Sequence, residues 1–398
     1  MKNKYKLFLA CSVFALTFVI AFFPIISKDG IIAPVNELRV NPFFNINNKP
    51  SPQLKGSTYD PIHQFIPWLH LNKESLKHHE LPLWNPYQGC GVPHIANIQS
   101  GLFYPLNIFV YILNWKWGLL LLYFFKFFLV GLFAYLYLSE IGIDYRASII
   151  ASISAMYSGL MNLFQFCHTR AAFCFFLGLW AIELIIKHSD KFRWYFLLML
   201  AFVIAVFAGQ PEVLFFMSLV LGMYFLIRLF SEYGFTKRAY LIIGKTGLVI
   251  SAGILISSIQ LLPFIEYLHF SSISLYRNSI ISSSFYSFDA IIAALDNFFS
   301  KDIINSHTWL EFDFNYVSLP MFIFGVSGII EFWNNKYVKP VSVLLLITFI
   351  LPFNVPLIHN IVSTVPLFNI AEKEYLWAFS GFCLIIVGSI YLDKLFKQ

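Results

Sequence analysis

The sequence predicts an all-α polytopic membrane protein, and three observations support that fold class. Of the 398 residues, 58% are hydrophobic, 19% are aromatic and only 12% are charged, and the mean hydropathy is +0.70. Apolar runs long enough to cross about 30 Å of hydrocarbon recur along the chain. Basic residues lie in alternate connections between these runs. A soluble fold could not bury so much apolar surface, so we expect residues 1–398 to form a single integral membrane domain.

Ten apolar runs are candidate transmembrane helices. They are Leu7–Ile26, Trp117–Leu138, Ala147–Phe166, Ala171–Ile186, Trp194–Ala208, Val213–Leu229, Leu241–Leu262, Tyr316–Phe332, Val341–Ile358 and Tyr375–Leu392. The first follows three lysines, but it is longer than the apolar core of a secretory signal and no small-x-small cleavage site follows it. We therefore expect an anchor that is retained. The shorter run Phe103–Leu113 is expected to be re-entrant or interfacial.

Lysine and arginine residues near the span ends predict the orientation. With the N-terminus in the cytoplasm, every inner connection is basic, whereas the short outer turns carry little beyond Arg170 and Lys373. The inner set is Lys2, Lys4, Lys6, Arg146, Lys187, Lys191, Arg193, Arg228, Lys237, Arg238, Lys245, Lys336, Lys339, Lys394 and Lys397. Both termini are therefore expected in the cytoplasm. The net charge of +6 follows this pattern, so we expect membrane lipids and no nucleic acid as partners.

Two long connections then face outward, residues 27–116 and residues 264–315. Both are rich in aromatic residues, and neither has the composition of an independent domain. We expect interfacial helices that lie over the outer end of the bundle. One of them begins at Asp60, because apolar residues follow at helical spacing. These are Ile62, Phe65, Ile66 and Leu69.

Asp60 is the first candidate catalytic residue, since a carboxylate at the outer face can act as a general base toward a hydroxyl. His63 and Gln64 follow one turn later and would orient the substrate. The structural alternative is a helix cap, because an aspartate followed by Pro61 is a common helix start. Spacing alone favours the cap.

The segment from Pro82 to Tyr104 is rich in proline, glycine and aromatic residues and is a second candidate. Its aromatic side chains can stack on sugar rings, and its amides can bond hydroxyl groups. The residues concerned are Trp84, Asn85, Tyr87, Gln99 and Tyr104. The alternative, which the sequence does not separate from the first, is a structural loop that closes the mouth of the bundle.

Two outer turns carry further candidates. His168 and Arg170 lie in the first, where an arginine can hold a lipid-linked phosphate. Gln210 and Glu212 lie in the second, in the run Gly-Gln-Pro-Glu, and can face the same cavity. The alternatives are an interfacial cation that meets lipid headgroups and an acid that favours a helix N-terminus.

Lys126 falls near the middle of a predicted span, and a charge inside a membrane is a functional signal. The alternative is a long lysine side chain that reaches the interface without a functional role. The five cysteines show no metal-binding spacing, and although Cys90 and Cys167 both fall on the outer side, we do not expect a disulfide. No glycine-rich phosphate loop or hydrolase elbow is present in the sequence, and one clear carboxylate is too few to predict a metal site. We expect no cofactor, and the sequence leaves the use of a divalent metal open.

Several of these residues together resemble the YfhO-like family of bacterial membrane proteins. The resemblance rests on Asp60-x-x-x-Gln64-x-x-Pro67, Leu81-Pro82-Leu83-Trp84-Asn85-Pro86-Tyr87 with Gly89, Gly91 and Pro93, Gln99-Ser100, Tyr104-Pro105, Arg146, the His168 turn and Gly209-Gln210-Pro211-Glu212. It covers nearly the whole chain, to about Leu392. The loop motif is fairly specific, whereas the later landmarks are weak on their own.

This resemblance implies a GT-C-like fold, that of the type C glycosyltransferases, which use polyprenyl-phosphate sugars on the outer face of the membrane. It implies that Asp60 is the base that activates the acceptor hydroxyl. The acceptor would be a cell-envelope glycopolymer such as a teichoic acid, or a lipid. The enzyme would lie in the cytoplasmic membrane of a bacterium.

The chain departs from the family pattern in two respects. Family members are often about twice as long, so a short or truncated, inactive relative is one alternative. The outer loop before the final span usually carries an arginine-rich motif, and here Lys373 stands in its place between Glu372 and Glu374. A lysine supplies a point charge but no bidentate clamp. The other alternative is a transporter or flippase for lipid-linked saccharides, with Lys126 in its path.

Overall fold

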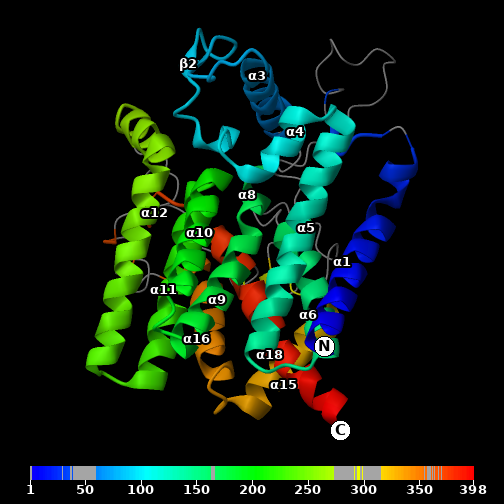
Figure 1. Ribbon diagram of the computed structural model, residues 1–398, viewed down its shortest axis with the longest axis vertical. Helices are drawn as coiled ribbons and strands as arrows, with labels where there is room; N and C mark the ends of the chain where they lie inside the picture. Colours follow the sequence, from blue (N-terminus) through cyan, green and yellow to red (C-terminus); the bar gives the residue numbers. More distant parts are fainter. Residues whose placement is uncertain are drawn as a thin grey trace.

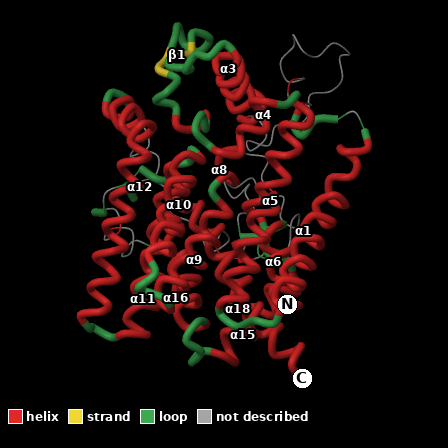
Figure 2. The backbone as a smooth tube through the Cα atoms, viewed as in Figure 1, coloured by secondary structure: helices red, strands yellow, loops and turns green. Residues whose placement is uncertain are grey.

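The protein is a bundle of helices with one end covered by a folded loop segment (Figures 1 and 2). The computed structural model describes residues 2–28, 30–35, 60–162, 166–272, 315–353 and 370–398, and a few positions between them, residues 38, 291, 294–295, 298, 355, 360, 362, 364–365 and 367–368. We call residues 60–113 the crown and the end they cover the crown end. The opposite end, near which both chain termini lie, is the terminal end (Figure 1).

The bundle and the crown differ in the length of their helices. The bundle contains α1 (Lys2–Ser27), α5 (Trp115–Glu140), α6 (Tyr145–Met156), α7 (Gly159–Asn162), α8 (Phe166–Arg170), α9 (Ala172–Lys187), α10 (Phe192–Ala208), α11 (Pro211–Tyr233), α12 (Lys237–His269), α15 (Leu319–Phe332), α16 (Val338–Ile350), the 3-10 turns η6 (Leu351–Phe353) and η7 (Lys373–Tyr375), and α18 (Leu376–Lys397). The crown contains η3 (Pro61–Phe65), α3 (Ile66–Lys77), η4 (Ile98–Ser100), η5 (Pro105–Asn107) and α4 (Ile108–Ile112). It also holds a two-stranded antiparallel ribbon, which is called the ribbon below. Its strands, of two residues each, are β1 (Trp84–Asn85) and β2 (Val92–Pro93).

Local sequence signals explain where several helices begin and end. The Asn114 side chain accepts a hydrogen bond from the Trp117 amide and caps α5, and Thr236 caps α12 in the same way through the Ala239 amide. Helix α10 ends at Gly209, which has a left-handed φ of +87°. Pro211 then opens α11, where its missing N–H leaves no helical bond unmade.

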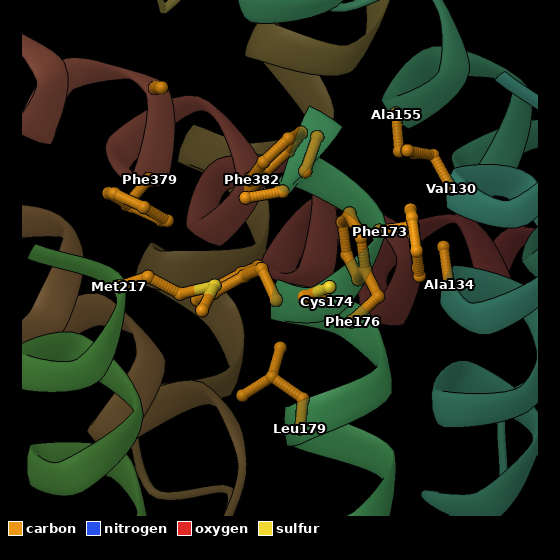
Figure 3. Packing of buried hydrophobic residues seen from close by; sticks show 14 of the residues in the cluster. Val130, Ala134, Ala155, Phe173, Cys174, Phe176, Leu179, Met217, Phe379 and Phe382 are labelled. Carbon is orange, nitrogen blue, oxygen red and sulfur yellow. The ribbon is translucent and has the colours of Figure 1, made fainter. Parts of the chain in front are cut away.

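The centre of the bundle is formed by α9 and α18. In each, 94% of the most apolar window is buried, whereas α1 and α12 are buried over only 17% and 22%. Figure 3 shows buried side chains of α9, with Phe173 on the side of Val130 and Ala134 of α5. The ring centres of Phe176 in α9 and Phe382 in α18 lie 4.9 Å apart. Large apolar side chains on α1 and α12 stay exposed, which suits helices that face lipid.

Small residues let α15 and α18 approach closely. A Cβ atom at Gly325 would lie 2.5 Å from Leu384, and one at Gly328 would lie 2.8 Å from the Val387 carbonyl oxygen. On the facing helix, Gly388 lies against Met321. Inside a membrane such close packing replaces the hydrophobic effect as the force that holds helices together.

The all-α, membrane-type fold predicted from the sequence is confirmed, with six helices of the described residues long and apolar enough to cross a membrane. Helices α10, α15 and α16 with η6 are apolar but shorter. In place of the predicted span Ala147–Phe166, α6 covers 12 residues and α7 follows after a break. The predicted total of ten spans stays a prediction. Most of the loop 264–315 lies outside the described residues, and its first part, to His269, continues α12.

Candidate functional site

The crown is seated on the bundle through two glycines. Gly101 follows η4 with a φ of +61°, and a Cβ there would lie 2.3 Å from Nη1 of Arg170. Gly209, in the turn between α10 and α11, would place a Cβ 2.2 Å from the Ile98 carbonyl oxygen. Only glycine permits both the left-handed backbone and the close approach. The segment 98–101 therefore lies directly against the ends of the helices below it.

Arg170 joins three separate segments at this contact. Its side chain is fully buried, and Nη1 donates to the carbonyl oxygens of Gln99 at 3.1 Å and Ala208 at 3.4 Å. The Tyr104 hydroxyl donates to the Arg170 carbonyl oxygen at 2.9 Å, and the guanidinium lies 5.6 Å from the Tyr104 ring centre. The arginine predicted to hold a phosphate is thus also a structural tie between the crown and the bundle.

Asp60 lies at the start of η3 and does not cap it. Its side chain accepts no capping hydrogen bond from the helix backbone. Instead, Nε2 of Gln64 donates to Oδ1 of Asp60 at 3.0 Å, and Asp60 is half-buried. The geometry therefore does not support the interpretation of Asp60 as a helix cap. The predicted amphipathic helix is present as η3 and α3, with Phe65 and Leu69 buried.

Two further acids approach Asp60 from distant parts of the chain. Oε1 of Glu212, in the first turn of α11, accepts a hydrogen bond from the Glu372 amide at 3.2 Å. Glu372 is exposed and lies close enough to Asp60 to affect its titration. Glu372 therefore lies near Asp60 at the crown end, and Glu212 bonds the backbone of Glu372, although the three residues are far apart along the chain.

A chain of amides connects these acids to Arg170. Nε2 of Gln210 donates to Oε2 of Glu212 at 3.2 Å. Nε2 of Gln99 donates to Oε1 of Gln210 at 2.9 Å, and the backbone carbonyl of Gln99 binds Arg170. Gln210 is buried and Glu212 is half-buried. This chain therefore holds the acids against the crown segment.

The electrostatic environment raises the pKa of the Asp60 carboxyl above its usual value. Partial burial is the main cause, and the negative charge of Glu372 adds to it, while His63 opposes both. A carboxylate with a raised pKa holds a proton more readily and is a better general base near neutral pH. Perturbed acids of this kind concentrate at functional sites.

His168, Tyr375 and Lys373 lie beside this cluster in the fold. Nε2 of His168 and the Tyr375 hydroxyl are 2.7 Å apart, and their rings stack at 5.1 Å. Lys373 directly follows Glu372 and is only 3% exposed. The connection before α18 therefore contributes an acid, a cation and an aromatic ring to the crown end.

Some predicted site residues lie away from the acids. Trp84 and Tyr87 are 54% and 87% exposed on the ribbon, and the Trp84 ring packs over Gly91. Asn85 is buried and accepts a hydrogen bond from the Tyr87 amide at 3.0 Å, a turn-forming role. His63 is half-buried one turn after Asp60. Cys90 is a free, exposed thiol, and the Cys167 side chain lies outside the described residues.

The sequence-based prediction missed several residues that organise this end. Glu372 and Tyr375 were not among the predicted site residues, although the sequence signal, a polar triplet beside an apolar span, was visible. Asn72 and His94 are fully buried and form a 2.8 Å hydrogen bond inside the crown. Nothing local to either residue indicated this pair. Within the described residues, no group of three His, Cys, Asp or Glu side chains is arranged to hold a metal ion.

Comparison with known proteins adds no relative, because no family model, curated protein or solved structure matches the chain.

Proposed function

We propose that this protein is a membrane glycosyltransferase that moves a sugar from a polyprenyl-phosphate donor to a cell-envelope polymer or lipid. The observation that carries the proposal is the approach of Glu372 to Asp60 at one end of an apolar bundle, with Glu212 bonded to the Glu372 backbone and the pKa of Asp60 raised. Like charges held together cost stability, so their placement calls for a functional reason. The resemblance of the loop motif to the YfhO-like family supports the same conclusion independently.

In the proposed reaction, Asp60 removes the proton of the acceptor hydroxyl. The hydroxyl oxygen then forms a bond to the anomeric carbon, and the bond from that carbon to the phosphate oxygen breaks. The electron pair leaves on the polyprenyl phosphate, and the anomeric configuration inverts. Gln64 holds Asp60 in position, and Lys373 and Arg170 supply positive charge for the leaving phosphate.

The exposed aromatic residues of the ribbon suit acceptor binding. Trp84 and Tyr87 present large exposed apolar surfaces in the crown. Aromatic faces of this kind pack against the C–H faces of sugar rings, whose hydroxyl groups remain in water. A polymeric acceptor extends beyond a single site, so an open surface in the crown fits such a substrate.

The orientation follows from the placement of charge. Described basic residues concentrate at the terminal end, for example Lys187, Lys191, Lys237 and Lys394. We propose ten spans in the bacterial cytoplasmic membrane with both termini inside, which puts the crown on the outer face. Cys90 offers a direct test, because a membrane-impermeant maleimide should label it in intact cells and Cys90→Ser should lose the label. Labelling only after cell lysis would reverse the orientation.

The function is tested by replacing the base. Asp60→Asn should lower sugar transfer from a polyprenyl-phosphate donor by at least about 100-fold, the usual contribution of a general base. Glu80→Gln is the matched control, since Glu80 is an exposed acid in the same crown. Full transfer by Asp60→Asn, with normal membrane insertion, removes Asp60 from the mechanism.

A second variant distinguishes the glycosyltransferase from the alternative function, a transporter of lipid-linked saccharides. Lys126 is 1% exposed in α5, with its ammonium 4.6 Å from the Tyr123 ring centre. A transport path through the bundle requires Lys126 more than Asp60. Lys126→Met should therefore leave transfer closer to wild type than Asp60→Asn does. The reverse ranking favours transport.

A further inference from the structure

A cavity of about 250 Å³ opens at the terminal end, opposite the crown. Its lining comes from the end of α9, the end of α11 and the connection between α15 and α16, and consists of Ile186, Lys187, Arg228, Glu232, Tyr233 and Lys336. Three of these six side chains are cationic and one is acidic. The cavity is built by segments far apart in sequence, and the proposed glycosyl transfer at the crown makes no use of it.

Arg228 is the buried centre of this cavity. Its side chain is 1% exposed, and Nε and Nη2 donate to the two oxygens of Glu183 at 2.8 and 3.0 Å. The Tyr224 hydroxyl donates to the same carboxylate at 2.8 Å. The remaining nitrogen, Nη1, is buried and donates to no acceptor in the described part of the chain. A buried donor left unsatisfied is costly. Nη1 has almost no accessible surface, so an acceptor in the cavity would reach it only after a small shift of the Arg228 side chain.

Of the other charges of the lining, Lys336 and Glu232 are loosely held, whereas Lys187 is paired closely with Glu140. Nζ of Lys336 lies 3.8 Å from Oε2 of Glu232, and Nη2 of Arg228 lies 3.9 Å from the same oxygen. Lys187 pairs with Glu140 at 2.7 Å and is about one-third exposed. One carboxylate is thus shared between two cations at the limit of ion-pair distance. Lys187 and Lys336 have long, flexible side chains that can turn toward an anion in the cavity.

We propose that this cavity binds a phosphate group. The guanidinium of Arg228 and the ammonium groups of Lys187 and Lys336 match the several acceptor oxygens that a phosphate presents. Glu183 neutralises Arg228 and Glu140 neutralises Lys187. Lys336, which lies 3.8 Å from Glu232, is therefore the least tightly held cation of the lining, and Arg228 supplies the fixed hydrogen-bond geometry. Glu232 selects against ligands that lack enough negative charge to compete for its two cationic neighbours. The phosphate can belong to a lipid headgroup or to a soluble phosphate, because both present the same oxygens.

Binding is tested on the full chain in detergent micelles by thermal unfolding. One arm adds inorganic phosphate against chloride at equal ionic strength. The other adds phosphatidylglycerol against diacylglycerol, which lacks the phosphate. Wild-type protein should be stabilised by at least one of the two phosphate-bearing probes. A response to phosphatidylglycerol alone identifies a lipid site, and a response to inorganic phosphate identifies a soluble ligand.

The variants are chosen to keep the Arg228–Glu183 pair intact. Lys187→Gln combined with Lys336→Gln should weaken the apparent affinity at least about tenfold, the loss of one charge-assisted hydrogen bond or more. Lys191→Gln combined with Lys339→Gln is the matched control, since these exposed lysines flank the same helices but do not line the cavity. Equal responses of wild type and the Lys187/Lys336 variant overturn the proposal, as does the absence of any response to both probes.

Discussion

The two ends of the bundle hold buried arginines in different ways. At the terminal end, Arg228 is bound by the carboxylate of Glu183, and the same end holds further ion pairs, such as Lys187 with Glu140 and Lys394 with Glu331. At the crown end, the hydrogen bonds that Arg170 donates through Nη1 go to backbone carbonyls of two segments. Of the eight ion pairs found among the described residues, only Lys77 with Glu74 lies in the crown.

This difference indicates which end of the molecule holds charged groups in an energetically unfavourable arrangement. The terminal end pairs Glu183, Glu140 and Glu331 with cations, an arrangement that lowers the energy of buried charge. The crown end instead gathers Asp60, Glu212 and Glu372, and Glu372 raises the pKa of Asp60. Close packing through Gly101 and Gly209 holds the crown against the bundle. The predictions below test this contrast, from the largest expected effect to the smallest.

Arg228→Met should lower the free energy of unfolding by about 3–5 kcal/mol, because Glu183 is left buried without its cation. Glu183→Leu should lower the free energy of unfolding by a similar amount, because Arg228 is then buried without its carboxylate partner. The double variant, with both charges removed, should regain most of the loss. Unfolding titrations in mixed micelles measure all three. If the double variant lost the sum of the two single losses of unfolding free energy, Arg228 and Glu183 would not stabilise each other as a pair.

Stability of the crown should depend on His94. Burial lowers the pKa of His94 to about 4, so the folded crown favours neutral imidazole. Its contribution is complete above the unfolded pKa of about 6.5 and is lost as the pH falls toward 4, up to about 3 kcal/mol. Protease resistance of residues 60–113 between pH 7.5 and 4.5 measures this loss. His94→Gln should flatten the profile, whereas His78→Gln, at an exposed position, should not.

Gly101→Ala should destabilise the crown by about 1–3 kcal/mol, because the new methyl group meets Arg170 and the backbone is left-handed. Gly89→Ala is the matched control, since its φ is +53° but nothing lies within 4 Å. The difference between the two variants in crown proteolysis isolates the contact with Arg170. If Gly101→Ala and Gly89→Ala increased proteolysis equally, backbone strain alone would explain the loss of stability, without a contribution from the contact with Arg170.

Glu372→Gln should produce the smallest effect, a lower pKa for Asp60. A raised carboxyl pKa gives stability that is present at low pH and lost as the pH rises through that pKa, because the ionised form is disfavoured. Removing Glu372 should therefore stabilise the protein at neutral pH, by less than about 1 kcal/mol since the site is partly exposed. The acidic limb of the transfer rate against pH should move to lower pH. An unchanged acidic limb of the pH–rate profile would mean that Glu372 does not affect the pKa of Asp60.

The residues of the candidate site show what a sequence pattern can predict. Helical spacing after Asp60 predicted the helix that η3 and α3 form, and Gly-Gln-Pro-Glu predicted the turn that separates α10 from α11. The same patterns favoured a cap for Asp60, which the geometry does not support. They also assigned Arg228 to a basic inner connection, whereas it is buried and paired with Glu183. Neither partner could be predicted, because Glu183 and Glu372 lie 45 and 312 residues from Arg228 and Asp60 (228 − 183; 372 − 60).

By itself, the sequence determined that this chain forms apolar helices of membrane length, and where most of them begin and end. Hydrophobic runs, caps and glycine turns act over a few residues, so they can be read along the chain. Only the tertiary structure decided that Asp60 meets Glu372, that Arg170 ties the crown to the bundle, and that Arg228 pairs with Glu183 at the far end. Those contacts depend on which helices become neighbours, and packing over the whole bundle determines that.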